Sequence, residues 1–255
     1  MPEEAVVHEF AGVAGTALAY HEVGEGRPLV LLHGYTLIAA DTWIRPGIAR
    51  RLAEDGRRVI MPDLRGHGAS ARPHDPASYP GDALVDDGLA LIEHLGLRDY
   101  DLGGYSVGGR VVARMLVRGA RPGRAIIGGT GLEPIIHAEG RGDAYRRTLA
   151  EFAAGTLGGE ETSSGWDVGA YLRSVDADPV ALALVLDTFV DTPREALEAI
   201  DTPTLVLAGE GEDRGSVDDL ASVLPQATLR RIPGDHGTAH LSPEFTEAIL
   251  TFLRN

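Results

Sequence analysis

The chain has 255 residues and carries 23 basic and 38 acidic side chains, for a formal net charge of −15. That length suits one large α/β domain with an insertion, and the negative charge argues against nucleic acid or an anionic lipid surface as a partner. No cysteine occurs, which excludes a disulfide scaffold, a thiolate nucleophile and any cysteine-based metal site.

Short β-branched or leucine-rich runs alternate with longer amphipathic segments along most of the chain, which is typical of a parallel sheet with helical crossovers. The first two runs are polar enough and close enough in sequence to form an antiparallel pair at the sheet edge. In chain order, the expected strands are Ala5–Phe10, Ala17–Glu22, Leu29–Leu32, Arg58–Met61, Tyr100–Gly103, Arg124–Gly128, Thr204–Leu207 and Thr228–Ile232. The sequence therefore predicts an α/β fold built on a mostly parallel, eight-stranded twisted sheet flanked by helices.

Amphipathic segments between these runs are expected to form the flanking helices. In one of them, Leu84, Leu91, Ile92 and Leu95 recur at helical spacing on one face, and Gly96 follows where a helix C-cap is expected. In chain order, the flanking helices are expected at Asp41–Glu54, Gly81–Leu95, Val107–Arg118, Ser216–Leu224 and Pro243–Leu253.

The alternation fails between Leu132 and Ile200, where several expected helices follow one another. They are Ala144–Ala154, Asp167–Val175, Pro179–Val190 and Pro193–Ala199. We therefore expect residues 132–200 to form a helical lid, inserted into an α/β core made of residues 1–131 and 201–255. In this lid Leu182, Val185, Leu186 and Phe189 share a face that is expected to pack on the main body, as core rather than as a substrate wall.

The pentapeptide Gly104-Tyr105-Ser106-Val107-Gly108 stands between an expected strand and an expected helix. Such a turn forces its central residue into a strained conformation with the side chain projecting into a cleft, and small residues two positions away prevent clashes. Ser106 is therefore the candidate nucleophile. The competing interpretation is a serine in an ordinary strand-to-helix turn.

Acyl transfer needs preorganised donors for the oxyanion of its tetrahedral intermediate, and backbone N–H groups are the usual donors. One candidate is the N–H of Val107, at the start of the helix that follows Ser106. The other is the N–H of Tyr35, in the loop after the third expected strand. The neighbouring His33 is expected to be a buried structural residue that bonds to backbone.

The loop Asp63-Leu64-Arg65-Gly66-His67-Gly68-Ala69-Ser70 follows the fourth expected strand. Its aspartate, arginine and glycines suit a loop that fixes its own turns through bonds from side chain to backbone. Neither a Walker loop nor a dinucleotide fingerprint fits its spacing, so a structural role is expected.

A general base is expected on the loop after the last strand, which reads Ile232-Pro233-Gly234-Asp235-His236-Gly237. A histidine on such a loop reaches over a nucleophile that lies at the same edge of the sheet. His236 is the candidate, and His240, four residues further on, is its rival.

The third member of such a site is a carboxylate that holds the imidazole tautomer and stabilises its cation. The loop after Leu207 offers Glu210, Glu212 and Asp213. Asp213 is favoured because it is nearest to the next helix and has the shorter side chain, which loses less conformational freedom when fixed. Glu212 and Glu210 stay open as alternatives.

Together these segments resemble the α/β-hydrolase family over essentially the whole chain. The order Ser106, Asp213, His236 is that family's order of nucleophile, acid and base. His33-Gly34-Tyr35 is similar to the family's His-Gly-x oxyanion motif, and residues 63–70 are similar to its Asp-x-Arg-Gly-x-Gly-x-Ser loop.

Two positions depart from the family pattern. The family commonly places its acid three positions after the strand-ending glycine, and counted from Gly209 that position is Glu212, so Asp213 requires a one-residue insertion. The histidine loop reads Gly-Asp-His, which leaves Asp235 without an assigned role. Ser106 at the elbow excludes the nucleophilic aspartate of the dehalogenases and epoxide hydrolases in this family.

The resemblance implies a serine hydrolase that cleaves a carboxylic ester or a similar acyl bond. Ser106 would attack the carbonyl, His236 would take and return the proton, and Asp213 would orient His236. The N–H groups of Tyr35 and Val107 would hold the oxyanion. This chemistry requires no metal or organic cofactor, and the expected partner is a small-molecule ester or acyl substrate.

Other functions on the same scaffold stay open. Relatives in this family include lyases, cyclases, C–C-bond hydrolases, cofactor-free oxygenases and receptor-like binding proteins. The apolar runs are too short to span a membrane, and the acidic N-terminus lacks a signal-peptide pattern, so a cytoplasmic protein is expected. Substrate identity and oligomeric state do not follow from the sequence.

Overall fold

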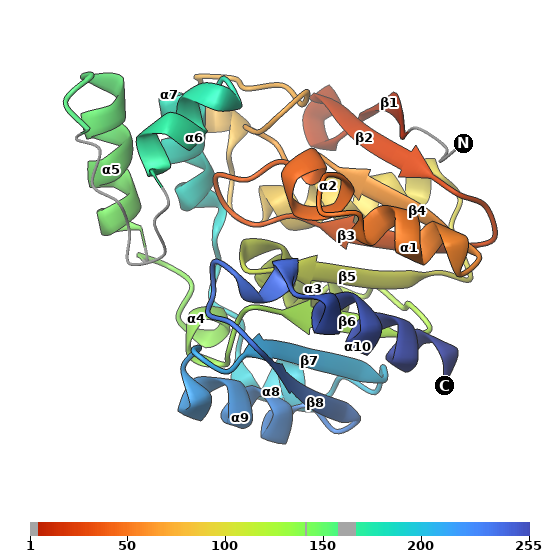
Figure 1. The fold of residues 1–255 in the computed structure, drawn as a ribbon. Coiled ribbons are helices and arrows are strands. Elements are labelled where there is room, and N and C mark those ends of the chain that lie inside the picture. The colour runs from red at the N-terminus through yellow and green to blue at the C-terminus, as the bar shows by residue number, and fades with distance from the viewer. Residues whose placement is uncertain (1–4, 141, 158–166) are drawn as a thin grey trace.

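The computed structural model describes residues 5–140, 142–157 and 167–255, and these contain one eight-stranded sheet (Figure 1). Its strand order is β1-β2-β4-β3-β5-β6-β7-β8. The strands are β1 (Val6–Ala11), β2 (Ala17–Val23), β3 (Arg27–Leu32), β4 (Arg57–Pro62), β5 (Asp101–Tyr105), β6 (Ala125–Gly128), β7 (Thr204–Gly209) and β8 (Ala227–Ile232). Strand β2 is antiparallel to both of its neighbours, and every ladder from β4 to β8 is parallel. The predicted fold class and the antiparallel edge pair are confirmed.

The helices lie between the strands in the chain, as the alternation predicts. They are α1 (Ile48–Glu54), α2 (Ala83–His94), α3 (Val107–Val117), α4 (Glu133–Ile136), α5 (Asp143–Ala153), α6 (Val168–Ser174), α7 (Pro179–Val185), α8 (Arg194–Glu198), α9 (Arg214–Val223) and α10 (Pro243–Arg254). Short helical turns occur at η1 (Val13–Gly15), η2 (Ala40–Ile44), η3 (Pro76–Ser78), η4 (Leu186–Thr188) and η5 (Ala239–Leu241).

One predicted helix is broken. The structure has the π-type turn η2 and then α1 where Asp41–Glu54 was expected to be continuous. Gly47 adopts φ 81°, ψ 9° between them, and Pro46 before it has no N–H to continue a helical ladder. The proline–glycine pair therefore ends the first turn and restarts the helix.

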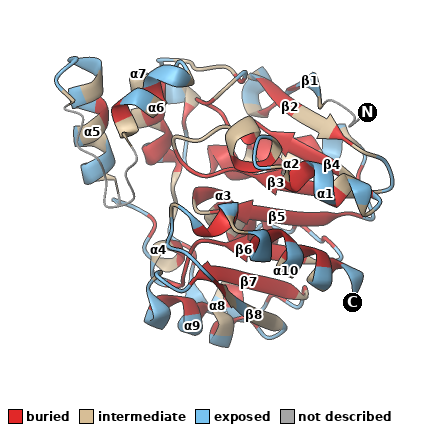
Figure 2. Ribbon diagram, viewed as in Figure 1, coloured by how far each residue is buried: buried red, intermediate tan, exposed pale blue. Residues whose placement is uncertain are grey.

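The core lies on both faces of the sheet. In β3, Val30 and Leu32 pack into a cluster with residues of α2, α3 and α9, whereas Leu29 and Leu31 pack with residues of α1 and α10. Successive side chains of a strand point to opposite faces, so β3 is covered by helices on both sides. Figure 2 shows the central strands buried along their length.

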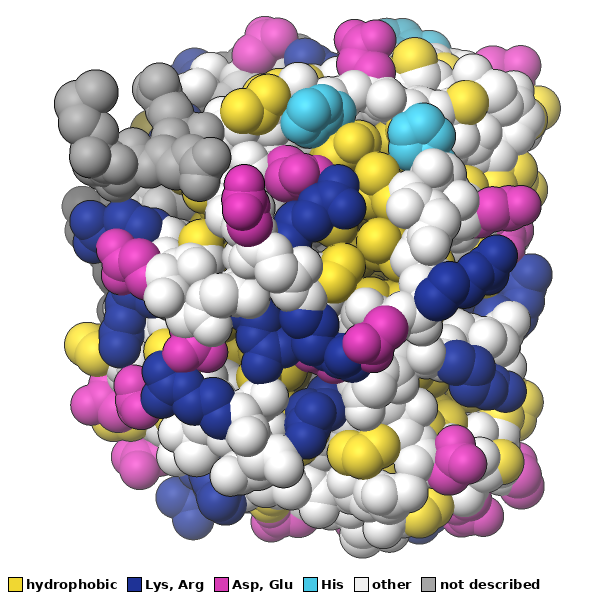
Figure 3. Space-filling model, turned by 90° about the vertical axis from the view of Figure 1, so that its right-hand side faces the viewer, with side chains coloured by type: hydrophobic (Ala, Val, Ile, Leu, Met, Phe, Trp, Pro, Cys, Tyr) yellow, Lys and Arg dark blue, Asp and Glu magenta, His cyan; other side chains and the backbone are white. Residues whose placement is uncertain are grey.

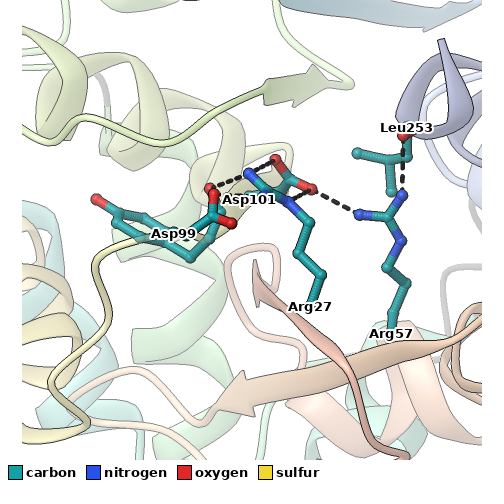
Figure 4. Close-up of polar contacts among 6 residues, drawn as sticks. Arg27, Arg57, Asp99, Asp101 and Leu253 are labelled. Atoms are coloured by element: carbon teal, nitrogen blue, oxygen red, sulfur yellow. Dashed lines mark hydrogen bonds and ion pairs between the residues drawn. The ribbon is translucent and has the colours of Figure 1, made fainter.

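A buried ion-pair cluster closes the end of the sheet where β3, β4 and β5 begin (Figure 4). Asp101 is fully buried, and it accepts hydrogen bonds from Arg27 Nε at 2.9 Å and from Arg57 Nη1 at 2.7 Å. Arg57 also donates to the carbonyl of Leu253 in α10, at 2.8 Å. Paired on both sides, this carboxylate ties three strands to the last helix.

The loop 63–70 is structural, as its composition predicts. Asp63 accepts hydrogen bonds from the amides of Ala39 and Ala69, at 2.9 and 3.0 Å. Burial alone would raise the pKa of Asp63, but hydrogen bonds from His21 and these amides lower it to about 2. Buried Arg65 forms a two-bond ion pair with Asp87 in α2, at 2.8 and 2.7 Å.

Helices α4 to α8 come between β6 and β7 in the chain. Of these, α5, α6 and α7 lie together at the upper left in Figure 1. Leu182, Val185 and Leu186 are buried and Phe189 packs against the same core cluster, so their predicted core role is confirmed. The division into a core and a lid at residues 132–200 stays a prediction, and residues 141 and 158–166 of that stretch lie outside the described ranges.

The surface mixes charges of both signs. On the side shown in Figure 3, which is at the right in Figure 1, arginine side chains lie beside carboxylates. Exposed pairs such as Arg51 with Glu247, at 3.3 Å, are of this kind. Among the described residues, none of the helices has both the length and the apolar character that crossing a bilayer would need.

Candidate active site

Ser106 occupies a sharp turn between β5 and α3. Its φ of 57° and ψ of −118° are strained for a residue with a side chain. A Cβ on Gly104 would lie 2.3 Å from the carbonyl carbon of Gly108, and a Cβ on Gly108 would lie 2.2 Å from the carbonyl oxygen of Leu32. Both flanking positions therefore require glycine, which explains the spacing of the pentapeptide.

His236 lies beside Ser106 on the loop after β8. The distance from Ser106 Oγ to His236 Nε2 is 3.0 Å, a hydrogen-bond distance. The phenol of Tyr105 donates to the His236 carbonyl at 2.8 Å, and the two rings stack with their centroids 5.6 Å apart. The structure thus brings the two predicted residues together at the carboxyl ends of β5 and β8.

The carboxylate that lies against Nδ1 of His236 is that of Glu212, not that of Asp213. Glu212 Oε2 lies 3.5 Å from His236 Nδ1, and the side chain is only 8% exposed. Its other oxygen accepts from the amide of Gly209 at 3.3 Å. The chain turns back at this point through a bond from the Glu212 amide to the Gly209 carbonyl, at 3.1 Å, which aims the side chain inward.

The placement expected for Asp213 is therefore corrected. Its carboxylate is the N-cap of α9, where it accepts from the amides of Gly215 and Ser216 at 3.0 and 3.4 Å. An aspartate directly before a helix satisfies amides that have no partner within the helix, and this bond holds its side chain away from the histidine. Glu210 is exposed.

The other residues of the histidine loop have structural positions. Asp235 accepts from the amides of Gly237 and Thr238, both at 3.0 Å, so it fixes the turn that carries His236. His240 is 6% exposed, and its ring lies 4.9 Å from that of Tyr105. Burial, with His236 nearby, lowers the pKa of His240 to about 4. The serine contact belongs to His236 and not to its rival.

The peptide between Gly34 and Tyr35 is held in one orientation. The Gly34 carbonyl accepts from His33 Nδ1 at 2.8 Å and from the Leu37 amide at 3.3 Å. His33 Nε2 accepts from the Leu64 amide at 2.9 Å, so the ring is neutral with its proton on Nδ1, and burial lowers its pKa. This is the structural role expected for His33.

The two predicted oxyanion donors border Ser106. The C=O and N–H of a trans peptide point in opposite directions, so fixing the Gly34 carbonyl also fixes the Tyr35 N–H. A Cβ on Gly34 would lie 3.3 Å from Ser106 Cβ, which places this loop against the serine. The N–H of Val107 is the first of α3. Within the described residues, neither N–H has a hydrogen-bond partner.

Two cavities meet at Ser106, and both are also lined by His236 and Tyr145. One, of about 300 Å³, is mostly apolar; its wall includes Leu37, Leu149, Val168 and Leu172. The other, of about 610 Å³, is wider open and more polar; its wall includes Arg110, Thr130, Glu133 and Glu212.

The residues that line these cavities were not among those predicted from the sequence. Helical periodicity placed α5 and α6, but it does not say which of their side chains face Ser106. Among the described residues, no group of three or more histidine, aspartate or glutamate side chains is arranged to hold a metal ion.

Comparisons with known proteins point to one class of enzymes. A family model described as the alpha/beta hydrolase fold matches residues 27–127. The chain is 28% identical to a non-heme haloperoxidase of Rhodococcus erythropolis, over 94% of this chain and 97% of that protein. It is also 28% identical to the non-heme chloroperoxidase CPO-A1 of Kitasatospora aureofaciens, over 94% and 96%.

Solved structures agree with that class. A thermophilic esterase from Thermogutta terrifontis is 28% identical with a TM-score of 0.76, over 99% of this chain and 98% of that one. A bromoperoxidase from Bacillus anthracis is 26% identical with a TM-score of 0.73, over 99% and 100%. The chain has the alpha/beta hydrolase fold, and the prediction of an enzyme with this fold is confirmed.

Proposed function

We propose that this protein is a serine hydrolase that cleaves a carboxylic ester or a related acyl bond. The observation that carries the proposal is the 3.0 Å contact between Ser106 Oγ and His236 Nε2 on a strained strand-to-helix turn. Glu212 takes the role of the acid, because its carboxylate lies against the other nitrogen of His236. The N–H groups of Tyr35 and Val107 hold the oxyanion.

In the first half of the reaction, Ser106 Oγ attacks the carbonyl carbon and its proton moves to His236 Nε2. The carbonyl oxygen becomes an oxyanion that accepts bonds from the two backbone N–H groups. The bond from carbon to the leaving oxygen then breaks, and His236 returns the proton to that oxygen. The alcohol departs and the acyl group stays on Ser106.

In the second half, water attacks the acyl-enzyme and passes a proton to the same nitrogen of His236. Collapse of the second tetrahedral intermediate releases the carboxylic acid, and the proton returns to Ser106. Glu212 stabilises the imidazolium in both halves. The proposed mechanism uses a small-molecule substrate and no metal or organic cofactor; a cytoplasmic location remains a prediction from the sequence.

The test combines labelling with turnover. A fluorophosphonate should attach to Ser106, as peptide mass mapping would show, and short p-nitrophenyl esters should be hydrolysed. Ser106→Ala should lower turnover by about 10⁴ or more while leaving the far-ultraviolet circular dichroism unchanged. A folded Ser106→Ala protein that keeps a tenth of the activity would contradict the proposal.

A C–C-bond hydrolase is the second candidate. A 2-hydroxymuconate semialdehyde hydrolase of Pseudomonas is 35% identical over 109 residues, which are 41% of this chain and 36% of that protein. Labelling of Ser106 without turnover of any ester would favour this candidate or a non-hydrolytic reaction on the same fold, and would argue against the esterase.

Several proteins that match over most of the chain are named as haloperoxidases, and these names suggest a further assay. Hydrogen peroxide that replaces water in the second half-reaction would form a peroxy acid, which oxidises halides. Halide oxidation that requires acetate, hydrogen peroxide and Ser106 would assign this activity to the same site.

A further inference from the structure

Helix α5 stands between the two cavities that meet at Ser106. Ala144 lines only the polar cavity, Thr148 and Leu149 line only the apolar cavity, and Tyr145 lines both. Contacts on two sides hold α5 in this position, where it forms the partition between the cavities. The Tyr145 ring meets the Tyr35 ring edge-on with centroids 4.9 Å apart, and Arg146 donates to the Ala183 carbonyl of α7 at 3.0 Å.

We infer that the substrates are esters with a compact apolar acyl group and a polar leaving group, and that α5 keeps the two sides apart. This inference rests on the proposed serine hydrolase. It assigns the apolar cavity to the acyl group and the polar cavity to the leaving group and to the water that replaces it.

The assignment of the two cavities follows because one base, His236, acts in both half-reactions. His236 Nε2 protonates the departing oxygen in the first half-reaction and deprotonates water in the second, so alcohol and water occupy the same place in turn. Water must therefore reach the leaving-group side. The wider, polar cavity, which is lined by His236 and Glu212, meets that requirement. A polar alcohol placed among the leucines of the other cavity would leave its hydroxyl without partners, which is costly.

The acyl group stays bound through both half-reactions, so it suits the more enclosed cavity. Leu37, Leu149, Val168 and Leu172 give that cavity an apolar wall. Its volume is about 300 Å³, and an apolar cavity of about 150 Å³ holds one benzene molecule. An acyl group up to roughly twice the size of benzene therefore fits, and long fatty acyl chains do not.

The test uses two ester series, with turnover followed by proton release. The first varies the acyl group from acetyl through hexanoyl and phenylacetyl to dodecanoyl on methanol. The second keeps the hexanoyl group and varies the alcohol from methanol to glycerol. For the wild-type protein, kcat/KM should rise to hexanoyl or phenylacetyl and fall by about tenfold or more for dodecanoyl.

Two substitutions one turn apart on α5 form a matched pair. Ala144 is exposed and Thr148 is half-buried, so a larger side chain at either position does not disturb the core. Thr148→Phe should lower kcat/KM for hexanoyl and phenylacetyl esters about tenfold or more and leave methyl acetate within about threefold. Ala144→Phe should instead lower turnover of the glyceryl ester relative to the methyl ester.

A third variant checks the partition itself. Tyr145→Ala should join the two cavities and raise the relative turnover of dodecanoyl esters. If Thr148→Phe acts on the alcohol series and Ala144→Phe on the acyl series, the assignment is reversed and the inference fails. Equal effects of both variants on both series would also overturn it. Ester turnover that persists in Ser106→Ala would instead defeat the proposed serine hydrolase.

Discussion

The phenol of Tyr35 donates a 2.7 Å hydrogen bond to the carbonyl of Leu182, 147 positions along the chain. Tyr35 also supplies one of the two proposed oxyanion donors through its backbone. This bond therefore ties the loop that borders Ser106 to helix α7, which comes between β6 and β7 in the chain, and both partners are buried. Burial raises the pKa of Tyr35, so the phenol stays a donor across the pH range in which the protein would work.

Tyr35→Phe should lower kcat about threefold to tenfold, the value of one neutral hydrogen bond, with KM almost unchanged. The ring still packs, but the loop loses its tie to α7 and the Tyr35 N–H is held less firmly. Steady-state kinetics on a short ester check this. Tyr79→Phe is the matched control, because the buried Tyr79 hydroxyl has no hydrogen-bond partner among the described residues. Equal losses in both variants would refute a positioning role for Tyr35.

Glu212→Gln should lower turnover by roughly 10³ to 10⁴, because an amide would stabilise the wrong tautomer of His236. Asp213→Ala should change turnover less than about tenfold, yet cost about 1 kcal/mol of unfolding free energy through loss of the α9 cap. Kinetics and urea unfolding of both variants separate the two roles. A crippled Asp213→Ala enzyme beside an active Glu212→Gln enzyme would restore the assignment expected from the sequence.

The stability of the protein should fall as the pH falls below 7, because of buried histidine. Burial, with His33 nearby, lowers the pKa of His67 from 6.5 to about 3. At pH values between these two, His67 is protonated in the unfolded chain but neutral in the folded protein. Lowering the pH in this range therefore stabilises the unfolded state. His67 alone should remove about 2 kcal/mol of unfolding free energy between pH 7 and pH 5.

Urea unfolding at the two pH values measures this loss, and His67→Phe should reduce it. A similar loss in wild-type and His67→Phe protein would show that other groups govern the dependence. Burial also lowers the pKa values of His33 and His240, so the variant should retain part of the effect.

Asp101→Asn should destabilise the protein by about 3 to 5 kcal/mol, because it leaves the buried Arg57 without its counter-charge and Arg27 with only the exposed Asp99. The specific activity should be unchanged below the melting temperature, since Asp101 starts β5 and Ser106 follows its other end. Asp99, whose side chain is 82% exposed, also contacts Arg27 and is the control. Asp99→Asn should cost less than about 1 kcal/mol by thermal unfolding.

The strands of the sheet and the sharp turn at Ser106 could be predicted from local sequence patterns. All eight expected strands are present, and their ends differ by at most two residues, because strand patterns and turn residues act locally. Ser106 was found in the same way, since the clash of a Cβ at Gly104 or Gly108 depends on a turn of five residues. His236 followed from the parallel order of strands, which brings loops at their carboxyl ends to one edge.

The carboxylate that contacts His236 and the side chains that line the cavities could be identified only in the folded chain. Glu212 and Asp213 are adjacent and chemically alike, and a single turn at Gly209 sends one inward and the other to the N-terminus of α9. Tyr145 and Leu172 reach the site from α5 and α6, whose apolar stripes predict burial but not the partner. Local sterics fix a turn, whereas a contact between distant segments depends on the path of all the chain between them.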